Sequence, residues 1–294
     1  MRRSFPVLAV KSFAKVNLYL RILGRRKDNF HNLDTLFARI DLHDTIRIRH
    51  REDGLIKIYC ANPDVPEDGT NLCSRAAEAL RKKCRIGSGL DIKIDKRIPV
   101  GAGLGGGSSN AASVLLALNK YWHLRLSRKE LSRIGSRIGS DVPFFIYETR
   151  FALGGAKGDR ITPLDYLKHT KLWFVLVYPG IKVSTPFVYK KFDSFLLKCG
   201  KKSLPCGNIS RLTRNKRDVK ILLYNDLESI TSSLYPLVKR VKGVFCSMGL
   251  EKAMMSGSGP TVFAICDGRA HAKDLSNKLR SKHKSWQVFL SSSV

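Results

Sequence analysis

Alternating apolar and polar residues are the clearest feature near the start of the chain. In FAKVNLYLRI, residues 13–22, every second residue is apolar, and Lys15 and Asn17 fall between the apolar positions. A period of two predicts a strand with one apolar face and one polar face. Shorter segments of similar character predict further strands at residues 44–50, 54–60 and 90–98.

Helical spacing alternates with these strands. Residues 71–84 have a helical pattern, and a second apolar stripe predicts a helix from Ser108 or Ser109 onward; its members are Ala111, Leu115, Leu118 and Trp122. Ser127 and Glu130 have the spacing of a capping box, which predicts a helix that turns Leu131, Ile134 and Ile138 inward and ends at Gly139. Residues 140–147, SDVPFFIY, are predicted to form a turn.

The second half of the chain continues the mixture of strands and helices. Residues 172–179 predict a strand, residues 257–266 predict a loop followed by a strand, and residues 232–249 and 270–283 predict helices. Residues 198–220 are rich in lysine and arginine and predict a solvated loop. We therefore expect an α+β protein with two domains, residues 1–165 and residues 166–294.

Composition narrows the classes of protein. The chain has 294 residues with 43% hydrophobic content, which is ordinary for a globular protein. It has no apolar run of the roughly 18 residues that span a membrane and no secretory signal pattern, so we expect a cytoplasmic protein. The seven cysteines form no C-x-x-C pair, which favours reduced thiols. The net charge of +29 favours anionic partners, either nucleotides or nucleic acid.

The glycine-rich stretch PVGAGLGGGSSN, residues 99–110, is the strongest candidate for chemistry. It fits G-x-G-x-x-G, but no acid follows at the spacing of a dinucleotide fold, and no protein-kinase motifs accompany it. A Walker loop needs a lysine before the serine, whereas this chain has Ser108-Ser109. A glycine loop that leads into a helix can still bind a phosphate through backbone N–H groups. The alternative is a tight turn that merely requires glycine.

Four segments in order point to one superfamily. KSFAKVNLYLRI, PVGAGLGGGSSNAA, GSDVPFF and MSGSGPTVFAI together resemble the motifs of the GHMP small-molecule kinases, over about residues 8–266. The resemblance implies ATP-dependent phosphorylation of a hydroxyl group. It also implies an N-terminal ribosomal-protein-S5-like α/β domain and a C-terminal ferredoxin-like α/β domain, with the active site between them.

The resemblance implies two catalytic residues. Asp141 matches the aspartate that takes the proton from the acceptor hydroxyl, and Lys15 matches the lysine that keeps this carboxylate ionised. Taken alone, Asp141 would be interpreted as a helix cap because Pro143 follows it, and Lys15 as a surface lysine.

The nucleotide site is implied in the same way. ATP would lie against Pro99, Gly101, Gly103, Leu104, Gly105, Gly106, Gly107, Ser108 and Ser109. Mg²⁺ is the implied cofactor, with Ser108 as a candidate ligand. No acid of the Walker-B type indicates further protein ligands of the metal.

Within the superfamily, FAKVNLYLRILGRRKDNFHNLDTLF and SDVPFF resemble the members that act on a diphosphocytidyl sugar alcohol. The substrate contacts implied are Asn17, Phe30, His31, Tyr189, Gly257 and Ser258. His31 would bind the cytosine edge, while the rings of Phe30 and Tyr189 would stack on its faces. Phe30 stands where tyrosine is usual, and the roles of Lys157 and Asp159 in GGAKGDR remain open.

Two alternatives remain at this point. Another small-molecule kinase, specific for mevalonate or homoserine, would share most of the motifs, although FHNLDTLF argues against it. A basic RNA-binding protein would explain the charge but would not need the ordered motifs. We expect small-molecule substrates, no specific nucleic acid, no membrane, and a monomer or weak homodimer.

Overall fold

The computed structural model describes residues 7–198 and 223–294, which divide into two compact units. Of the described residues, unit 1 comprises 7–14, 43–100 and 105–148, and unit 2 comprises 15–42, 101–104, 149–198 and 223–294. Two long strands, β1 (Leu8–Arg25) and β2 (His31–Arg51), contribute to both units. The predicted α+β class is confirmed. The predicted domain boundary near residue 165 stays a prediction.

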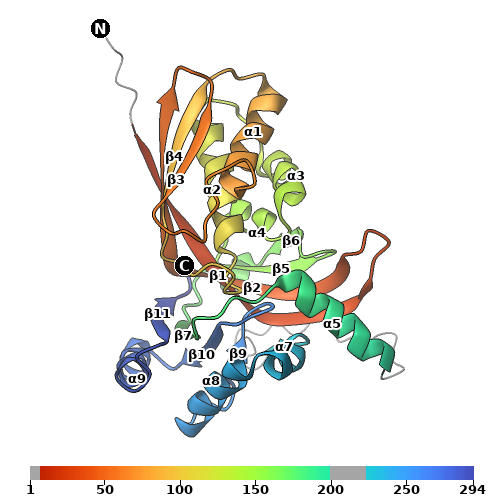
Figure 1. Ribbon diagram of the computed structural model, residues 1–294, viewed down its shortest axis with the longest axis vertical. Coiled ribbons are helices and arrows are strands. Elements are labelled where there is room, and N and C mark those ends of the chain that lie inside the picture. The colour runs from red at the N-terminus through yellow and green to blue at the C-terminus, as the bar shows by residue number, and fades with distance from the viewer. Residues whose placement is uncertain (1–6, 199–222) are drawn as a thin grey trace. The chain divides into compact units, whose positions relative to one another are not determined.

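Unit 1 has helices packed on one face of a sheet. β4 (Gly89–Asp95) pairs antiparallel with β2 and parallel with β3 (Ile56–Cys60). Alternate residues of these strands, such as Ile48 and Ile92, are buried. Figure 1 shows the helices of this unit on one side of β3 and β4. The apolar face that the sequence pattern predicts is therefore the face that the helices cover.

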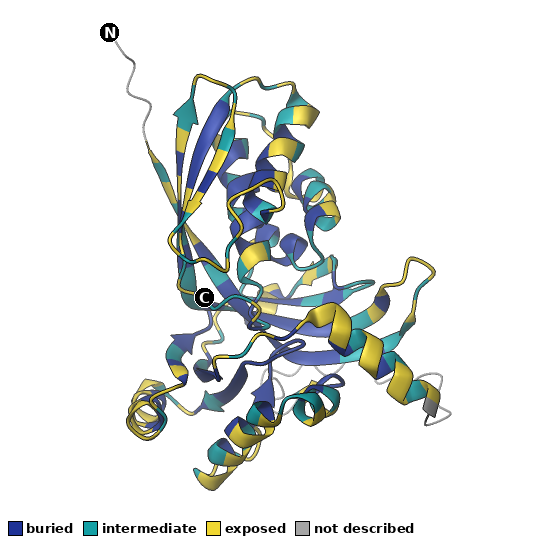
Figure 2. Ribbon diagram, in the orientation of Figure 1, coloured by how far each residue is buried: buried dark blue, intermediate teal, exposed yellow. Residues whose placement is uncertain are grey.

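The central helix of unit 1 is α2 (Gly106–Tyr121), which contacts α1 (Leu72–Cys84), α3 (Arg128–Ile138) and α4 (Val142–Tyr147). Figure 2 shows it largely buried. It begins two or three residues earlier than predicted, with Gly105 as a left-handed N-cap. The capping box of Ser127 and Glu130 is confirmed.

The prediction of a turn at residues 140–147 is wrong, because this segment forms helix α4. Pro143 lies in the first turn of the helix, where its missing N–H removes no helical hydrogen bond. Val142, Phe144 and Ile146 are fully buried, and this packing stabilises a helix of only six residues.

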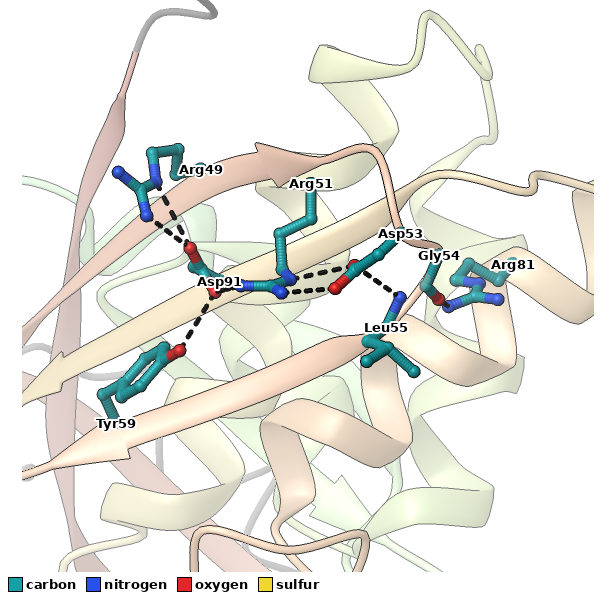
Figure 3. A network of polar contacts seen from close by, with 8 residues as sticks. All are labelled: Arg49, Arg51, Asp53, Gly54, Leu55, Tyr59, Arg81 and Asp91. Carbon is teal, nitrogen blue, oxygen red and sulfur yellow. Dashed lines mark hydrogen bonds and ion pairs between the residues drawn. The ribbon is translucent and has the colours of Figure 1, made fainter.

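The other face of the unit 1 sheet carries a polar network around Asp91 (Figure 3). The carboxylate of Asp91 accepts from Arg49 Nη2 at 2.7 Å and from Arg51 Nη1 at 2.8 Å. Arg51 also pairs with Asp53, and Tyr59 Oη lies 3.3 Å from Asp91. Burial by itself would raise the pKa of Asp91, but the two arginines hold it below its ordinary value.

Unit 2 contains a four-stranded antiparallel sheet in the order β11 (Gln287–Ser292), β7 (Trp173–Tyr178), β10 (Val262–Cys266) and β9 (Met254–Met255). Helices α8 (Pro236–Ser247) and α9 (Arg269–Lys282) pack against it. Their shared core includes Val175, Val177 and Phe245. The strand predicted at residues 172–179 is this β7.

The remaining elements of unit 2 lie mostly around the long strands. β5 (Phe151–Gly155) pairs with β2 and with β6 (Arg160–Pro163), while β8 (Tyr224–Asn225) pairs parallel with β1. The other helices are α5 (Thr185–Lys198), α7 (Glu228–Leu234) and the 3₁₀ turn Asp165–Leu167.

The single helix predicted at residues 232–249 is wrong, because α7 ends and α8 begins around Pro236. Proline disfavours a helical conformation in the residue before it, and Tyr235 has φ −130° and ψ 87°.

Several predictions concern the cysteines and the basic loop. Cys60, Cys73, Cys84, Cys246 and Cys266 are free thiols, and burial raises the pKa of Cys73 to about 12. Cys199, Cys206 and residues 199–220 of the predicted loop lie outside the described residues. Within the described ranges, the longest apolar helices fall short of a membrane span.

Candidate functional site

The first half of the glycine loop, residues 101–104, lies against the segment 256–261 in unit 2. Gly103 has φ +76°, and a Cβ atom there would lie 2.2 Å from the carbonyl oxygen of Ser256, so only glycine fits. Ser256 Oγ donates to the carbonyl of Gly103 at 3.0 Å, and the N–H of Lys15 donates to Leu104 O at 3.0 Å. The glycine loop and the MSGSGPT motif, about 150 residues apart in sequence, are therefore in contact.

A polar cluster on strand β1 faces this contact. Lys15 is only 4% exposed, and its ammonium donates to Asn17 Oδ1 at 2.6 Å. Asn17 Nδ2 in turn donates to Thr35 Oγ1 at 2.8 Å. A Cβ at Gly257 would lie 3.2 Å from Asn17 Oδ1 and 3.5 Å from Lys15 Nζ, so the backbone of Gly257 approaches both groups closely. The face that the sequence pattern marks as polar is therefore buried, because residues 256–258 cover it.

Side chains of unit 2 hold the MSGSGPT segment in this position. Asn225 Nδ2 donates to the carbonyl oxygens of Met255 and Gly257, both at 2.8 Å. Ser258 Oγ lies 2.7 Å from Thr185 Oγ1, at the first residue of α5. The predicted substrate contacts Asn17, Gly257 and Ser258 thus belong to one fixed arrangement.

The second half of the glycine loop, residues 105–109, begins helix α2 in unit 1. Gly105 has φ +69° and no side chain to cap the helix, so an external acceptor can bind the first-turn N–H groups. The helix dipole places positive potential at the same point. Gly106 and Ser108 are partly exposed, and Gly107 is exposed. Ser109 is buried, with its hydroxyl donating to Phe13 O at 2.5 Å.

Asp141 occupies the N-cap position of α4 but does not cap that helix. Its backbone is helical, with φ −83° and ψ −13°, and its carboxylate makes no capping hydrogen bond. The interpretation of Asp141 as a helix cap is therefore wrong, because its side chain does not bond to the first turn of α4. A carboxylate at this position has the chemistry that a general base requires.

The predicted base-binding residues lie together in unit 2. The rings of His31 and Tyr189 are 4.9 Å apart at an angle of 30°. His31 Nε2 lies 2.7 Å from Asp193 Oδ1, and His31 is buried. Asp193 lies one helical turn after Tyr189 on α5, so one face of this helix contributes both residues.

Phe30 stands at the tip of the β1–β2 hairpin with 50% of its surface exposed. The ammonium of Lys157 lies 5.1 Å from its ring centroid, in cation–π contact. Lys157 also pairs with Asp159 at 3.6 Å. The segment GGAKGDR, whose function the sequence left open, therefore supports the ring of Phe30.

Comparison with known proteins places this arrangement in a family. The GHMP kinases N terminal domain matches residues 71–149, and the GHMP kinases C terminal domain matches residues 209–285. Together they cover more than half of the sequence. The chain belongs to the GHMP kinases.

Two relatives of this GHMP kinase match almost its whole length. A protein of Syntrophus aciditrophicus named 4-diphosphocytidyl-2-C-methyl-D-erythritol kinase is 40% identical over 98% of the chain and all of the relative. A protein of the same name from Geobacter sp. strain M21 is 42% identical over 93% of the chain and 94% of the relative.

Solved structures agree with the fold. The crystal structure of a 4-(cytidine 5'-diphospho)-2C-methyl-D-erythritol kinase matches 97% of the chain and 98% of its own length, with a TM-score of 0.78 and 30% identity. The mevalonate kinase of L. major has a TM-score of 0.71 at 14% identity, covering 99% of the chain and 98% of its own length, which shows a shared fold only. The predicted GHMP kinase fold is confirmed.

Some residues of the site were not singled out from the sequence. Thr35 and Ser256 lie inside the FHNLDTLF and MSGSGPT segments but were given no role, and Asn225 lies in no motif, because each acts through a partner that is remote in sequence. Asp193 was also missed, although its spacing of four from Tyr189 on a helix is a usable signal.

Proposed function

We propose that this GHMP kinase transfers the γ-phosphoryl group of ATP to the 2-hydroxyl of 4-diphosphocytidyl-2-C-methyl-D-erythritol. The products are the 2-phosphate and ADP, in the non-mevalonate pathway to isoprenoid precursors. The observation that carries the proposal is the 40% identity to a kinase of that name over the full length of the relative. The family itself supports ATP as the phosphoryl donor.

Asp141 and Lys15 carry the chemistry in this proposal. Asp141, at the start of α4, accepts the proton of the attacking hydroxyl, a role that its match to the aspartate of the GSDVPFF motif supports. Lys15 supplies a buried positive charge that stabilises the developing alkoxide. Asn17 holds the Lys15 ammonium in a fixed direction through its 2.6 Å hydrogen bond.

ATP binds through the glycine loop in this proposal, with its phosphates at the N-terminus of α2. The predicted contacts from Pro99 to Ser109 are retained, although the N–H and hydroxyl of Ser109 both bond within the protein. That geometry favours a role for Ser109 in holding the loop.

Mg²⁺ is part of the proposal because its chemistry suits the donors of this chain. Among residues 7–198 and 223–294, no group of three or more His, Cys, Asp or Glu side chains could hold a metal. In this proposal the ion would take most of its ligands from the phosphates and water. The hydroxyl of Ser108 is the proposed protein ligand, and the ion would neutralise charge on the phosphates.

The cytidine end of the acceptor is assigned to the His31 cluster. A neutral base can stack on aromatic rings and exchange hydrogen bonds with a ring nitrogen of His31. The Asp193 carboxylate fixes one nitrogen of that ring. We place the enzyme in the cytoplasm, as a monomer or weak homodimer with small-molecule substrates and no specific nucleic-acid or membrane partner.

A coupled assay of ADP release tests the proposal. We expect turnover with 4-diphosphocytidyl-2-C-methyl-D-erythritol and none with mevalonate or homoserine presented in parallel. Turnover with either of the latter alone would overturn the acceptor assignment. In the same assay, Lys15→Met should lower kcat at least 100-fold, and an unchanged kcat would remove Lys15 from the mechanism.

A further inference from the structure

The strongest buried polar network outside the site described above surrounds Asp44 in unit 1. Asp44 has no exposed surface, and its carboxylate accepts four hydrogen bonds. Lys96 Nζ donates to it at 2.5 Å, and the backbone N–H groups of Arg97 and Ile98 donate at 2.7 and 2.8 Å. Asn110 Nδ2 completes the set at 2.8 Å.

These four donors come from both ends of the glycine loop. Residues 96–98 immediately precede Pro99, and Asn110 belongs to the first turns of α2. A carboxylate with four fixed donors holds both segments at one point, so it fixes where the loop begins and where it enters the helix.

The network continues from Asn110 to strand β1. Asn110 Nδ2 also lies 2.9 Å from Ser12 Oγ, and the hydroxyls of Ser12 and Ser109 are 2.7 Å apart. Because Ser109 in turn donates to the backbone carbonyl of Phe13, the side chains at the start of α2 tie this helix to β1.

The charge of Lys96 lies directly beside the loop. Its side chain is 6% exposed, and a Cβ built on Gly106 would come within 2.9 Å of its ammonium. A side chain at Gly106 would therefore require this ammonium to shift from the place where Asp44 holds it.

We propose that Asp44 is the positioning residue of the phosphate-binding loop, acting through Lys96, Asn110 and Ser12 on the backbone N–H groups that receive ATP. The inference rests on the ATP-binding role given to the loop under the proposed function. A shift of about 1 Å in a catalytic or binding group can lower the reaction rate on the order of 100-fold. ATP binding therefore requires that both ends of the loop be held in place, and the fully buried Asp44 holds them.

Binding of a non-hydrolysable ATP analogue by calorimetry tests this role, with no acceptor present. Asp44→Asn keeps the shape but presents an amide N–H₂ to two donors, and we expect Kd to rise at least tenfold. KM for ATP should rise in parallel, while KM for the acceptor should change less than twofold. A change of less than twofold in Kd would overturn the inference.

Asp91→Asn is the matched control, because Asp91 is also a buried aspartate of the unit 1 sheet with basic partners, but its ion pairs go to Arg49 and Arg51 and not to residues of the loop (Figure 3). We expect both variants to melt at a lower temperature, but Asp91→Asn should bind the analogue within twofold of wild type. Equal weakening by both variants would show a general loss of stability and would refute a positioning role.

A milder variant covers the case in which Asp44→Asn does not fold. Ser12→Ala removes the hydroxyl that joins Asn110 to Ser109 and leaves the ion pair intact, and we expect a three- to tenfold rise in Kd. Wild-type affinity in this variant would contradict the inference. A wild-type chain that binds the analogue but phosphorylates none of the acceptors refutes only the proposed substrate, whereas one that does not bind it overturns both.

Discussion

Removal of the Asp193 carboxylate tests whether His31 binds the cytosine. Asp193→Ala deletes the partner that lies 2.7 Å from His31 Nε2, on a helix where alanine is well tolerated. The ring of His31 then keeps its contact with Tyr189 but loses the group that fixes its tautomer and orientation.

The expected magnitude follows from the burial of the two partners. A hydrogen bond to a charged group contributes about 1.5–3 kcal/mol. His31 is buried, but the Asp193 side chain is 23% exposed, so water replaces part of the lost bond. We therefore expect a cost near the lower limit, about 1.5–2 kcal/mol, which is a rise of roughly 10- to 30-fold in KM for the cytidine substrate.

Steady-state kinetics with each substrate varied in turn measures this effect. KM for ATP should stay within twofold of wild type, and Asp193→Asn, which keeps an acceptor oxygen, should cost less than about fivefold. Asp274→Ala is the control, since it removes an exposed carboxylate paired with Lys278 on α9 of the same unit and should change neither KM. An unchanged KM for the cytidine substrate, or an equal rise for ATP, would refute the assignment of His31 to the base.

Three further predictions address catalysis, stacking and stability. Asp141→Asn should abolish turnover with an unchanged melting temperature, because the carboxylate does not cap α4; near-normal turnover would exclude it as the base. Phe30→Ala should raise KM for the cytidine substrate about 5- to 150-fold, from a stacking energy of roughly 1–3 kcal/mol, while Phe30→Tyr stays near wild type; a rise for ATP instead would reverse the two nucleotide sites. Asp91 has a lowered pKa in the folded state, so its contribution is present above the ordinary aspartate pKa of about 3.9 and is lost as pH falls through the folded value. Denaturant titrations should accordingly show Asp91→Asn less stable than wild type by about 1–3 kcal/mol at pH 7, with the gap closing at lower pH; a gap independent of pH would contradict the ion-pair explanation.

Local sequence patterns predicted most helices and strands of the fold, because each of these patterns depends only on residues a few positions apart. The capping box of Ser127 and Glu130 needs only residues three apart, and it appears as predicted. Pro236 was overlooked as a break inside an apolar helical pattern, although proline is itself a local signal. α4 was missed for the opposite reason, since its six residues are helical only because tertiary packing buries them.

The candidate site was predictable only where a motif could be compared with a family. Local sequence patterns could not show the contacts that hold the motifs in place. Ser256 binds Gly103 and Asn225 binds Gly257 across long stretches of sequence. Alternation on β1 also suggested that Lys15 faces solvent, whereas the structure buries it. A period of two shows which residues share a face, but it does not show what later segment will cover that face.

The three aspartates Asp44, Asp91 and Asp141 show why acid residues need the structure before they can be assigned. Asp44 and Asp91 both lie on strands in patterns that favour polar, solvated positions, yet both are buried. Asp141 precedes a proline and has the local sequence of a cap, yet its carboxylate makes no cap. Asp44 and Asp91 differ in their hydrogen-bond donors. Asp91 accepts from two arginines on the neighbouring strand, whereas Asp44 accepts from residues at the two ends of the glycine loop. Since only the second set of donors belongs to the segment that we propose binds ATP, we expect loss of Asp44 to affect ATP binding and loss of Asp91 to affect only stability.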